Sequence, residues 1–188
     1  MKIITCWFLL ALGAVAHAEV QIERTYLPFD ASPSSFAIGL PGGVNFCFDA
    51  VRGGVSYAWS GGFIDLTNVR PGMGKKISPA ALLGPVVYRE SGPAPLRRGD
   101  PARAPIVEFK GYTLRDAAVE FRYTVDGLLV REEIKARADG GGLMRTFRVE
   151  NSVGEKWWYA PAGQPPSNLT PESSGSFTLA TPFGKAAP

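Results

Sequence analysis

Apolar and polar residues alternate with a period of two along the second half of the chain. In the run from Val119 to Val125, every second residue is apolar, and the residues between them are charged or carry a hydroxyl group. This alternation is typical of a β-strand with one buried and one solvated face. Asp126-Gly127 follows directly and favours a hairpin turn, because both residues tolerate positive φ. We therefore expect a return strand over about 128–137.

The alternation resumes after the turn at Asp139-Gly140-Gly141-Gly142. One face of the next expected strand carries Leu143, Arg145, Phe147 and Val149. Another expected strand begins near position 107, so the region predicts an antiparallel meander of three or four strands with one wet face. Four acidic side chains in these strands are interpreted as charges on the solvated face: Glu108, Glu120, Glu132 and Glu133.

The first half of the chain predicts shorter strands separated by glycine-rich turns. Positions 69–105 are rich in Pro and Gly and are expected to be mostly loop. Short strands at roughly ten-residue spacing are typical of a sandwich or barrel. We therefore expect an all-β fold, an antiparallel β-sandwich with long Pro/Gly-rich loops. The other expected strands are 35–40, 44–50, 55–59, 63–66, 86–89 and 176–180.

The N-terminal 18 residues resemble a secretory signal peptide. Lys2 precedes an apolar run from Ile3 to Val15, and Ala16-His17-Ala18 is a small-x-small cleavage pattern. The run is shorter than the ~20 apolar residues of a membrane span. The expected protein is periplasmic or secreted, with no membrane span after cleavage. The expected divisions are 1–18 signal peptide, 19–34 lead-in, 35–183 one sandwich domain and 184–188 frayed tail.

Cleavage would change which chemistries the chain can support. It would remove His17, the only histidine, and Cys6, which would leave Cys47 as the only cysteine. Serine or cysteine nucleophiles activated by histidine, His/Cys zinc sites and c-type haem attachment are then excluded. No metal and no cofactor are expected. Cys47 lies between two phenylalanines in an expected strand and is interpreted as a buried, unreactive thiol.

The net charge of +3 implies no nucleic-acid partner. The candidate ligand-binding residues are two carboxylates at strongly turn-forming positions, Asp49 and Asp65, and four aromatic residues, Trp59, Trp157, Trp158 and Tyr159. For Trp59, the alternative to ligand binding is packing in the hydrophobic core. If Trp157 and Trp158 lie on a strand, one of the two rings must point outward. No catalytic pair can be selected from the sequence.

Two segments resemble a known family. Residues 36–49, FAIGLPGGVNFCFD, and 57–65, YAWSGGFID, are similar to a secreted bacterial β-sandwich domain found beside c-type cytochrome and sugar-dehydrogenase-like modules. The similarity extends through 109–112 and 120–127, and covers about 36–133. It implies an exported accessory domain with a c-type cytochrome, a sugar dehydrogenase or a glycan as partner.

The hairpin together with residues 143–151 also resembles galactose-mutarotase-type sandwiches. Those enzymes use histidine with a carboxylate, and the cleaved chain would contain no histidine, so that activity is not expected. We expect an exported non-catalytic binding or interaction module that docks to a periplasmic redox or carbohydrate-processing partner. The alternatives are a carbohydrate-active enzyme that uses carboxylates, with Asp49 and Asp65 tested first, and a structural envelope-associated domain without a small ligand. The sequence leaves enzymatic activity open but favours its absence.

Overall fold

The computed structural model describes residues 19–70, 72–74, 76–150, 154–170, 172 and 175–184. All regular elements within these residues are β-strands, and the described part of the chain has no helix that could cross a membrane. The expected signal peptide and positions 185–188 of the expected tail lie outside the described residues. The predicted all-β sandwich is confirmed.

The first large sheet has five antiparallel strands in the order β1-β2-β3-β4-β7. Its β1 strand lies in the expected lead-in segment and pairs with β2 through Gln21–Gly39 and Arg24–Phe36. A separate two-stranded sheet, β5-β6, belongs to the excursion between β4 and β7. The bounds are β1 Gln21–Arg24, β2 Ser35–Leu40, β3 Val44–Asp49, β4 Gly54–Ser60, β5 Ile64–Asp65, β6 Ala81–Leu82 and β7 Val86–Arg89.

The second large sheet is the meander predicted from the alternation, extended by the last strand, in the order β15-β12-β11-β10-β9. Val125 pairs with Leu128 across the hairpin, where Asp126 and Gly127 have φ values of 48° and 83°. Both turn residues therefore adopt the left-handed conformation that the Asp-Gly pair favours. The bounds are β9 Val107–Leu114, β10 Ala118–Val125, β11 Leu128–Ala136, β12 Gly142–Val149 and β15 Ser176–Pro182.

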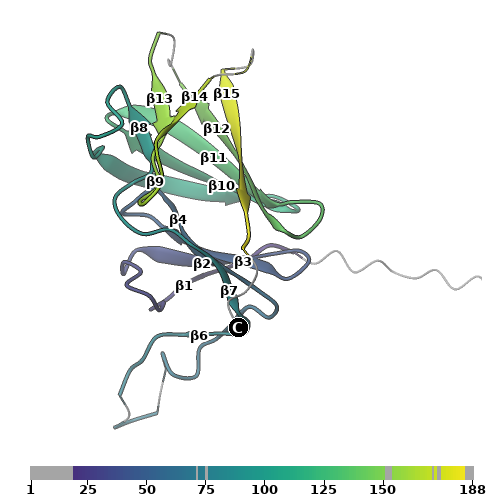
Figure 1. Ribbon diagram of the computed structural model, residues 1–188. Coiled ribbons are helices and arrows are strands. Elements are labelled where there is room, and N and C mark those ends of the chain that lie inside the picture. Colours follow the sequence, from purple (N-terminus) through teal and green to yellow (C-terminus); the bar gives the residue numbers. More distant parts are fainter. Residues whose placement is uncertain are drawn as a thin grey trace, which may run out of the picture.

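The two large sheets form the layers of the sandwich (Figure 1) and bury one hydrophobic core between them. The Phe48 ring of β3 stacks on the Phe121 ring of β10, with centroids 3.7 Å apart and an interplanar angle of 7°. Phe36 and Phe109 extend this aromatic region, with centroids 5.5 Å apart. Alternation directs these rings inward from both sheets, which is why they meet.

A third sheet, in the order β14-β13-β8, adds to the same core. Its strands are β8 Leu96–Arg98, β13 Trp157–Tyr159 and β14 Ser167–Leu169. Trp157 is fully buried, and its ring lies 6.2 Å from that of Phe177 in β15. Trp158, the next residue, is half-buried, so the rings of the pair point to opposite faces as predicted.

The centre of the first sheet is buried on both faces: every residue of β2 and β3 is buried. A second apolar cluster lies on the face away from the second sheet, where Cys47, Tyr57 and Trp59 pack against Leu27 and Ala80. The chain before β2 and the excursion after β5 therefore cover this face. Cys47 is fully buried, which confirms the burial expected for its thiol.

Candidate functional site

The interior contains an ion pair that is fully buried. Glu132 of β11 and Arg145 of β12 have no exposed surface, and Arg145 Nε donates to Glu132 Oε1 at 2.5 Å. Tyr123 donates its hydroxyl proton to the other oxygen of Glu132 at 2.8 Å. Buried charges require partners of this kind, because the loss of water is costly for each ion.

The interpretation of Glu132 as a solvated charge is wrong, and so is that of Glu120. Glu132 pairs across strands with Phe121, and both side chains face inward because paired residues share a face. Glu120 is 5% exposed and accepts a hydrogen bond from Arg115 at 2.8 Å. Glu120 lies on the face opposite Phe121, as the alternation predicts, and is buried because Arg115 and Arg131 cover it. The sequence does not place Glu132 inward, because the pattern of its own strand does not fix which face is buried. Glu108 is exposed and Glu133 is half-buried.

The buried pair extends to the other layers of the fold. Arg145 Nη1 donates to the Tyr159 hydroxyl at 2.6 Å, and this hydroxyl donates to Glu90 Oε2 at 2.6 Å. Tyr88 donates to the same oxygen of Glu90, also at 2.6 Å. One continuous polar network therefore links β11 and β12 of the second sheet, β13 of the small sheet and the end of β7 in the first sheet.

The protonation states of this network are set by burial. Desolvation, with the nearby Arg145 charge opposing it, raises the pKa of Tyr159 to about 12. Desolvation also raises the pKa of Tyr123 well above its usual value. Desolvation opposes the charge of Arg145, but the carboxylates of Glu132 and Glu90 and the Tyr159 hydroxyl together hold its pKa well above normal. The two tyrosines therefore stay protonated donors and the guanidinium stays charged near neutral pH.

Arg52 connects this network to a cleft of about 500 Å³. Its Nη1 donates to Ser56 Oγ at 3.0 Å and to the Glu90 carbonyl at 2.9 Å, and its Nη2 donates to Glu90 Oε1 at 3.2 Å. Glu90 therefore uses both carboxylate oxygens within the protein. The cleft is lined by Phe29, Asp30, Asp49, Arg52, Ser56, Tyr57, Arg89, Glu90, Ser91 and Gly92.

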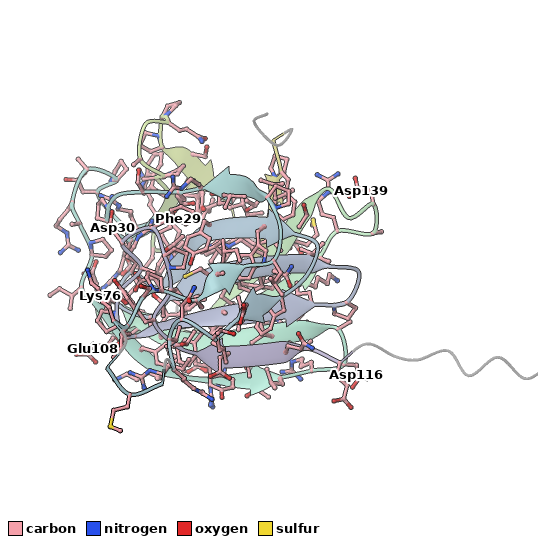
Figure 2. All side chains as sticks on the ribbon, turned by 90° about the horizontal axis from the view of Figure 1, so that it is seen from below. Phe29, Asp30, Lys76, Glu108, Asp116 and Asp139 are labelled. Carbon is pink, nitrogen blue, oxygen red and sulfur yellow. The ribbon has the colours of Figure 1, made fainter. Side chains whose placement is uncertain are left out.

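The outer wall of the cleft combines an aromatic ring with a cation. The Arg89 guanidinium lies 4.0 Å from the centroid of the Phe29 ring, and this ring meets Tyr57 edge to face at 5.2 Å. Arg89 of β7 pairs across strands with Tyr57 of β4, so the two side chains share one face of the first sheet. Phe29 and Asp30 have φ values of 61° and 57° and lie at the end of the strands opposite Asp116 and Asp139 (Figure 2).

Asp49 fixes the loop that carries Phe29 and Asp30. Its Oδ1 accepts from Ser32 Oγ at 2.7 Å and from the Val51 backbone N–H at 2.9 Å, and its Oδ2 accepts from the Ser32 backbone N–H at 3.2 Å. Asp49 is 4% exposed. The side chain therefore joins two segments of chain beside the cleft and has a structural part in building it.

Tyr57 contributes a buried hydroxyl to the lining. Burial raises its pKa far above the usual value, with the Cys47 thiol adding to the effect, so the hydroxyl remains protonated. Its oxygen interacts with the Cys47 thiol and has no other hydrogen-bond partner among the described residues.

The other candidate residues from the sequence do not gather at this cleft. Trp59 is fully buried and donates from Nε1 to the Phe63 carbonyl at 2.8 Å, so it belongs to the covered face of the first sheet. Asp65 is exposed, and hydrogen bonds from Thr67 lower its pKa. Trp158 donates to the Gly99 carbonyl at 2.8 Å. Of the six candidates, Asp49 lines the cleft and Tyr159 reaches it through Glu90.

Several residues of the site were missed from the sequence. Arg52, Arg89 and Glu90 carry no motif, and the sequence assigns the loop containing Phe29 to the lead-in segment 19–34. The sequence does contain one signal of the buried network: the alternation places Arg145 on the same face as Leu143 and Phe147. A charged residue on an otherwise apolar face indicates a buried partner.

The described residues contain no group of three or more His, Cys, Asp or Glu side chains arranged to hold a metal ion. The chemistry of the cleft is therefore described by its hydrogen-bond donors, carboxylates and aromatic rings. Comparisons with protein-family models, with curated proteins and with solved structures find no match to this chain.

Proposed function

We propose that this chain is an exported, non-catalytic binding module whose cleft holds a small polar ligand. One observation carries the proposal: both buried carboxylates that line the cleft, Asp49 and Glu90, are already engaged by donors of the protein itself. A volume of about 500 Å³ lies in the range of small-molecule sites. An aromatic wall with a few fixed polar groups is the usual composition of such sites.

Catalysis is disfavoured by the same groups. A general base must be free to take a proton and must have a pKa near the working pH. Three donors occupy the carboxylate oxygens of Glu90, and Tyr57 is held protonated by burial. The hydrogen bonds of Asp49 hold the loop in place. The lining therefore provides fixed contacts and lacks a free proton acceptor at its base.

A ligand screen tests the binding function. We expect glucose, galactose, glucuronate or galacturonate to raise the melting temperature of the mature protein in a concentration-dependent way, as mass action requires. No turnover of glycosides made from these sugars is expected. If no compound in the screen changes the melting temperature, the proposal of ligand binding fails. The alternative, a structural envelope-associated domain without a small ligand, is then favoured.

The proposed partner is a periplasmic c-type cytochrome or sugar dehydrogenase, on the strength of the sequence resemblance. The mature protein, immobilised and exposed to native periplasm, is expected to retain one of these enzymes. A matched capture with heat-unfolded protein gives the background. Recovery of neither class of enzyme above that background would remove the partner from the proposal while leaving ligand binding untouched.

A carbohydrate-active enzyme remains the second candidate, because Asp49 and Glu90 line one cleft. It predicts turnover of a sugar substrate that is lost in Asp49→Asn or Glu90→Gln, with Asp65→Asn as the exposed control. Turnover that survives both cleft substitutions would remove these carboxylates from a catalytic role. Circular dichroism is needed beside the assay, since Asp49 also holds the loop.

A further inference from the structure

The hydrogen-bonding capacity of the cleft is unbalanced, and this deepens the proposed binding function, on which the following argument rests. The acceptors in its inner wall are used: Glu90 receives Arg52, Tyr88 and Tyr159. Asp49 is equally engaged by Ser32 and by the backbone of Val51. A ligand therefore finds few free acceptors at the base of this site.

Donors, in contrast, are left over. Arg89 is an exposed residue, and among the described residues no side chain or carbonyl forms an ion pair or hydrogen bond with its guanidinium, which lies over the Phe29 ring and whose charge also acts on the Tyr57 hydroxyl. One buried donor of the lining, Arg52 Nε, has no hydrogen-bond partner within the described chain, and Tyr57 Oη has only the Cys47 thiol beside it. Unpaired buried donors are rare in proteins, because each one loses its hydrogen bonds to water without replacement.

The position of Arg89 suits it to bind a ligand. A guanidinium that stacks on an aromatic face keeps the N–H groups in its own plane free. Those N–H groups form a rigid fork that matches the two oxygens of a carboxylate or a sulfate. Phe29 and Arg89 both line the cleft, and the contact with the Phe29 ring uses the face of the guanidinium and none of its N–H groups.

The charges that oppose an anion are mostly compensated. Glu90 is paired with Arg52 at 3.2 Å, and Asp49 is surrounded by donors. Asp30 remains as an exposed carboxylate at the rim, on the same loop as Phe29. Asp30 therefore should weaken the binding of an anion, and Arg89 should strengthen it.

We propose that the cleft binds an oxyanion group of its ligand, with Arg89 as the residue that contacts it and the Phe29 ring as the group that positions Arg89. A cleft of this size accommodates a sugar acid, whose carboxylate would meet Arg89 and whose ring would lie between the aromatic wall and Ser56. The same donors would also take a free inorganic anion.

The experiment is a titration of the full mature protein with sodium glucuronate, with glucose and with sodium sulfate, followed by NMR of the arginine Nε–H signals and by calorimetry. Glucose lacks the carboxylate of glucuronate and is the matched ligand. Arg148→Gln is the matched protein control, because Arg148 is, like Arg89, an exposed strand arginine that forms no ion pair with another described residue, and it is not part of the cleft lining. Constant ionic strength removes general salt effects.

We expect the Arg89 and Asp30 variants to change the affinity for glucuronate in opposite directions. Arg89→Gln should weaken glucuronate binding at least about tenfold, since hydrogen bonds to charged groups are the strong ones. Asp30→Asn should strengthen it about two- to fivefold, since a nearby like charge is removed and Asn tolerates the positive φ. Arg148→Gln should leave the affinity unchanged. Sulfate binding that follows the same order without glucuronate binding would assign the site to an inorganic anion.

Two results would overturn the inference. If glucose binds as tightly as glucuronate and Arg89→Gln has no effect, the cleft is a binding site but not an oxyanion site. If neither glucuronate nor sulfate shifts the Arg89 signal more than that of Arg148, the oxyanion site does not exist. The proposed binding function would then be tested by glucose and galactose alone in the ligand screen. The oxyanion proposal can therefore fail while the binding proposal holds.

Discussion

The interior between the two large sheets contains an aromatic region and a charged region, both built from neighbouring strands. In the aromatic region, Phe48 and Phe121 stack face to face and need no specific polar partner. In the charged region, Arg145 depends on Glu132 and Tyr159, and these depend in turn on Tyr123 and Glu90. Packing tolerates small changes of shape, whereas a buried polar network tolerates loss of a member poorly. We therefore expect the charged region to be the more sensitive to single substitutions.

The largest expected effect is in the charged region. Arg145→Met leaves the Glu132 carboxylate buried without its cation, and we expect a loss of about 3–5 kcal/mol in the free energy of unfolding. Urea denaturation followed by tryptophan fluorescence measures it. The double variant Arg145→Met with Glu132→Leu should recover at least half of the loss, because a hydrophobic pair removes both ions. A double variant that is less stable than the single one would contradict this account.

The hydroxyl that links Arg145 to Glu90 is the next test. Tyr159→Phe keeps the ring but removes one acceptor and one donor, and we expect a loss of about 2 kcal/mol in unfolding free energy. Tyr112→Phe is a suitable control, since Tyr112 is exposed and its hydroxyl forms no hydrogen bond with another described residue. Equal effects of the two substitutions would show that the network adds little to packing.

The aromatic region should respond less. Phe121→Leu retains most of the buried volume but loses the stacking with Phe48, and we expect a loss of about 1.5 kcal/mol. The same urea series measures it. A loss as large as that of Arg145→Met would reverse the comparison between the two regions.

The smallest expected effect concerns Cys47, which lies outside both regions on the covered face of the first sheet. Burial raises the pKa of its thiol from 9.0 to about 12, so the folded state favours the protonated form. The resulting stabilisation is fully present below pH 9.0 and is lost as the pH rises from 9.0 toward 12. Near neutral pH we therefore expect Cys47→Ala, made in a chain that begins at Glu19 and so lacks Cys6, to abolish thiol labelling without creating any pH dependence of stability.

Labelling of the wild-type thiol provides the measurement for this prediction. Thiolate is the reactive form, so native protein at pH 8 should react far more slowly than protein in concentrated urea. Native labelling as fast as in urea would show that Cys47 is accessible, and would contradict its burial on the covered face.

The strands were largely predictable because short-range pattern determines them. The expected ranges 35–40 and 86–89 agree with β2 and β7, and the Asp126-Gly127 turn lies where the sequence places it. The sequence does not predict β1, β6, β8 and β14 and treats a strand at β13 only as a possibility, because these strands have two to four residues and owe their form to pairing with neighbours.

The candidate site was much less predictable than the strands. Asp49 was selected for its turn and does line the cleft, but Arg89 and Glu90 come from one strand end, and Phe29 from a loop 60 residues earlier in the chain. Only the pairing of β4 with β7 brings Tyr57 and Arg89 together. Trp59 and Trp157 are candidate ligand-binding residues because they are aromatic, but large rings also pack in hydrophobic cores. Burial distinguishes ligand binding from core packing, and both rings are fully buried.

The double burial of the first sheet has a consequence for amide hydrogen exchange. Both faces of β2 and β3 are covered, and each of these strands has a hydrogen-bonded neighbour on either side. Their amide protons should exchange with solvent only when the whole domain unfolds, and their rates then report its global stability. β9 lies at the edge of the second sheet with much of its surface exposed, so its amides should exchange through local opening.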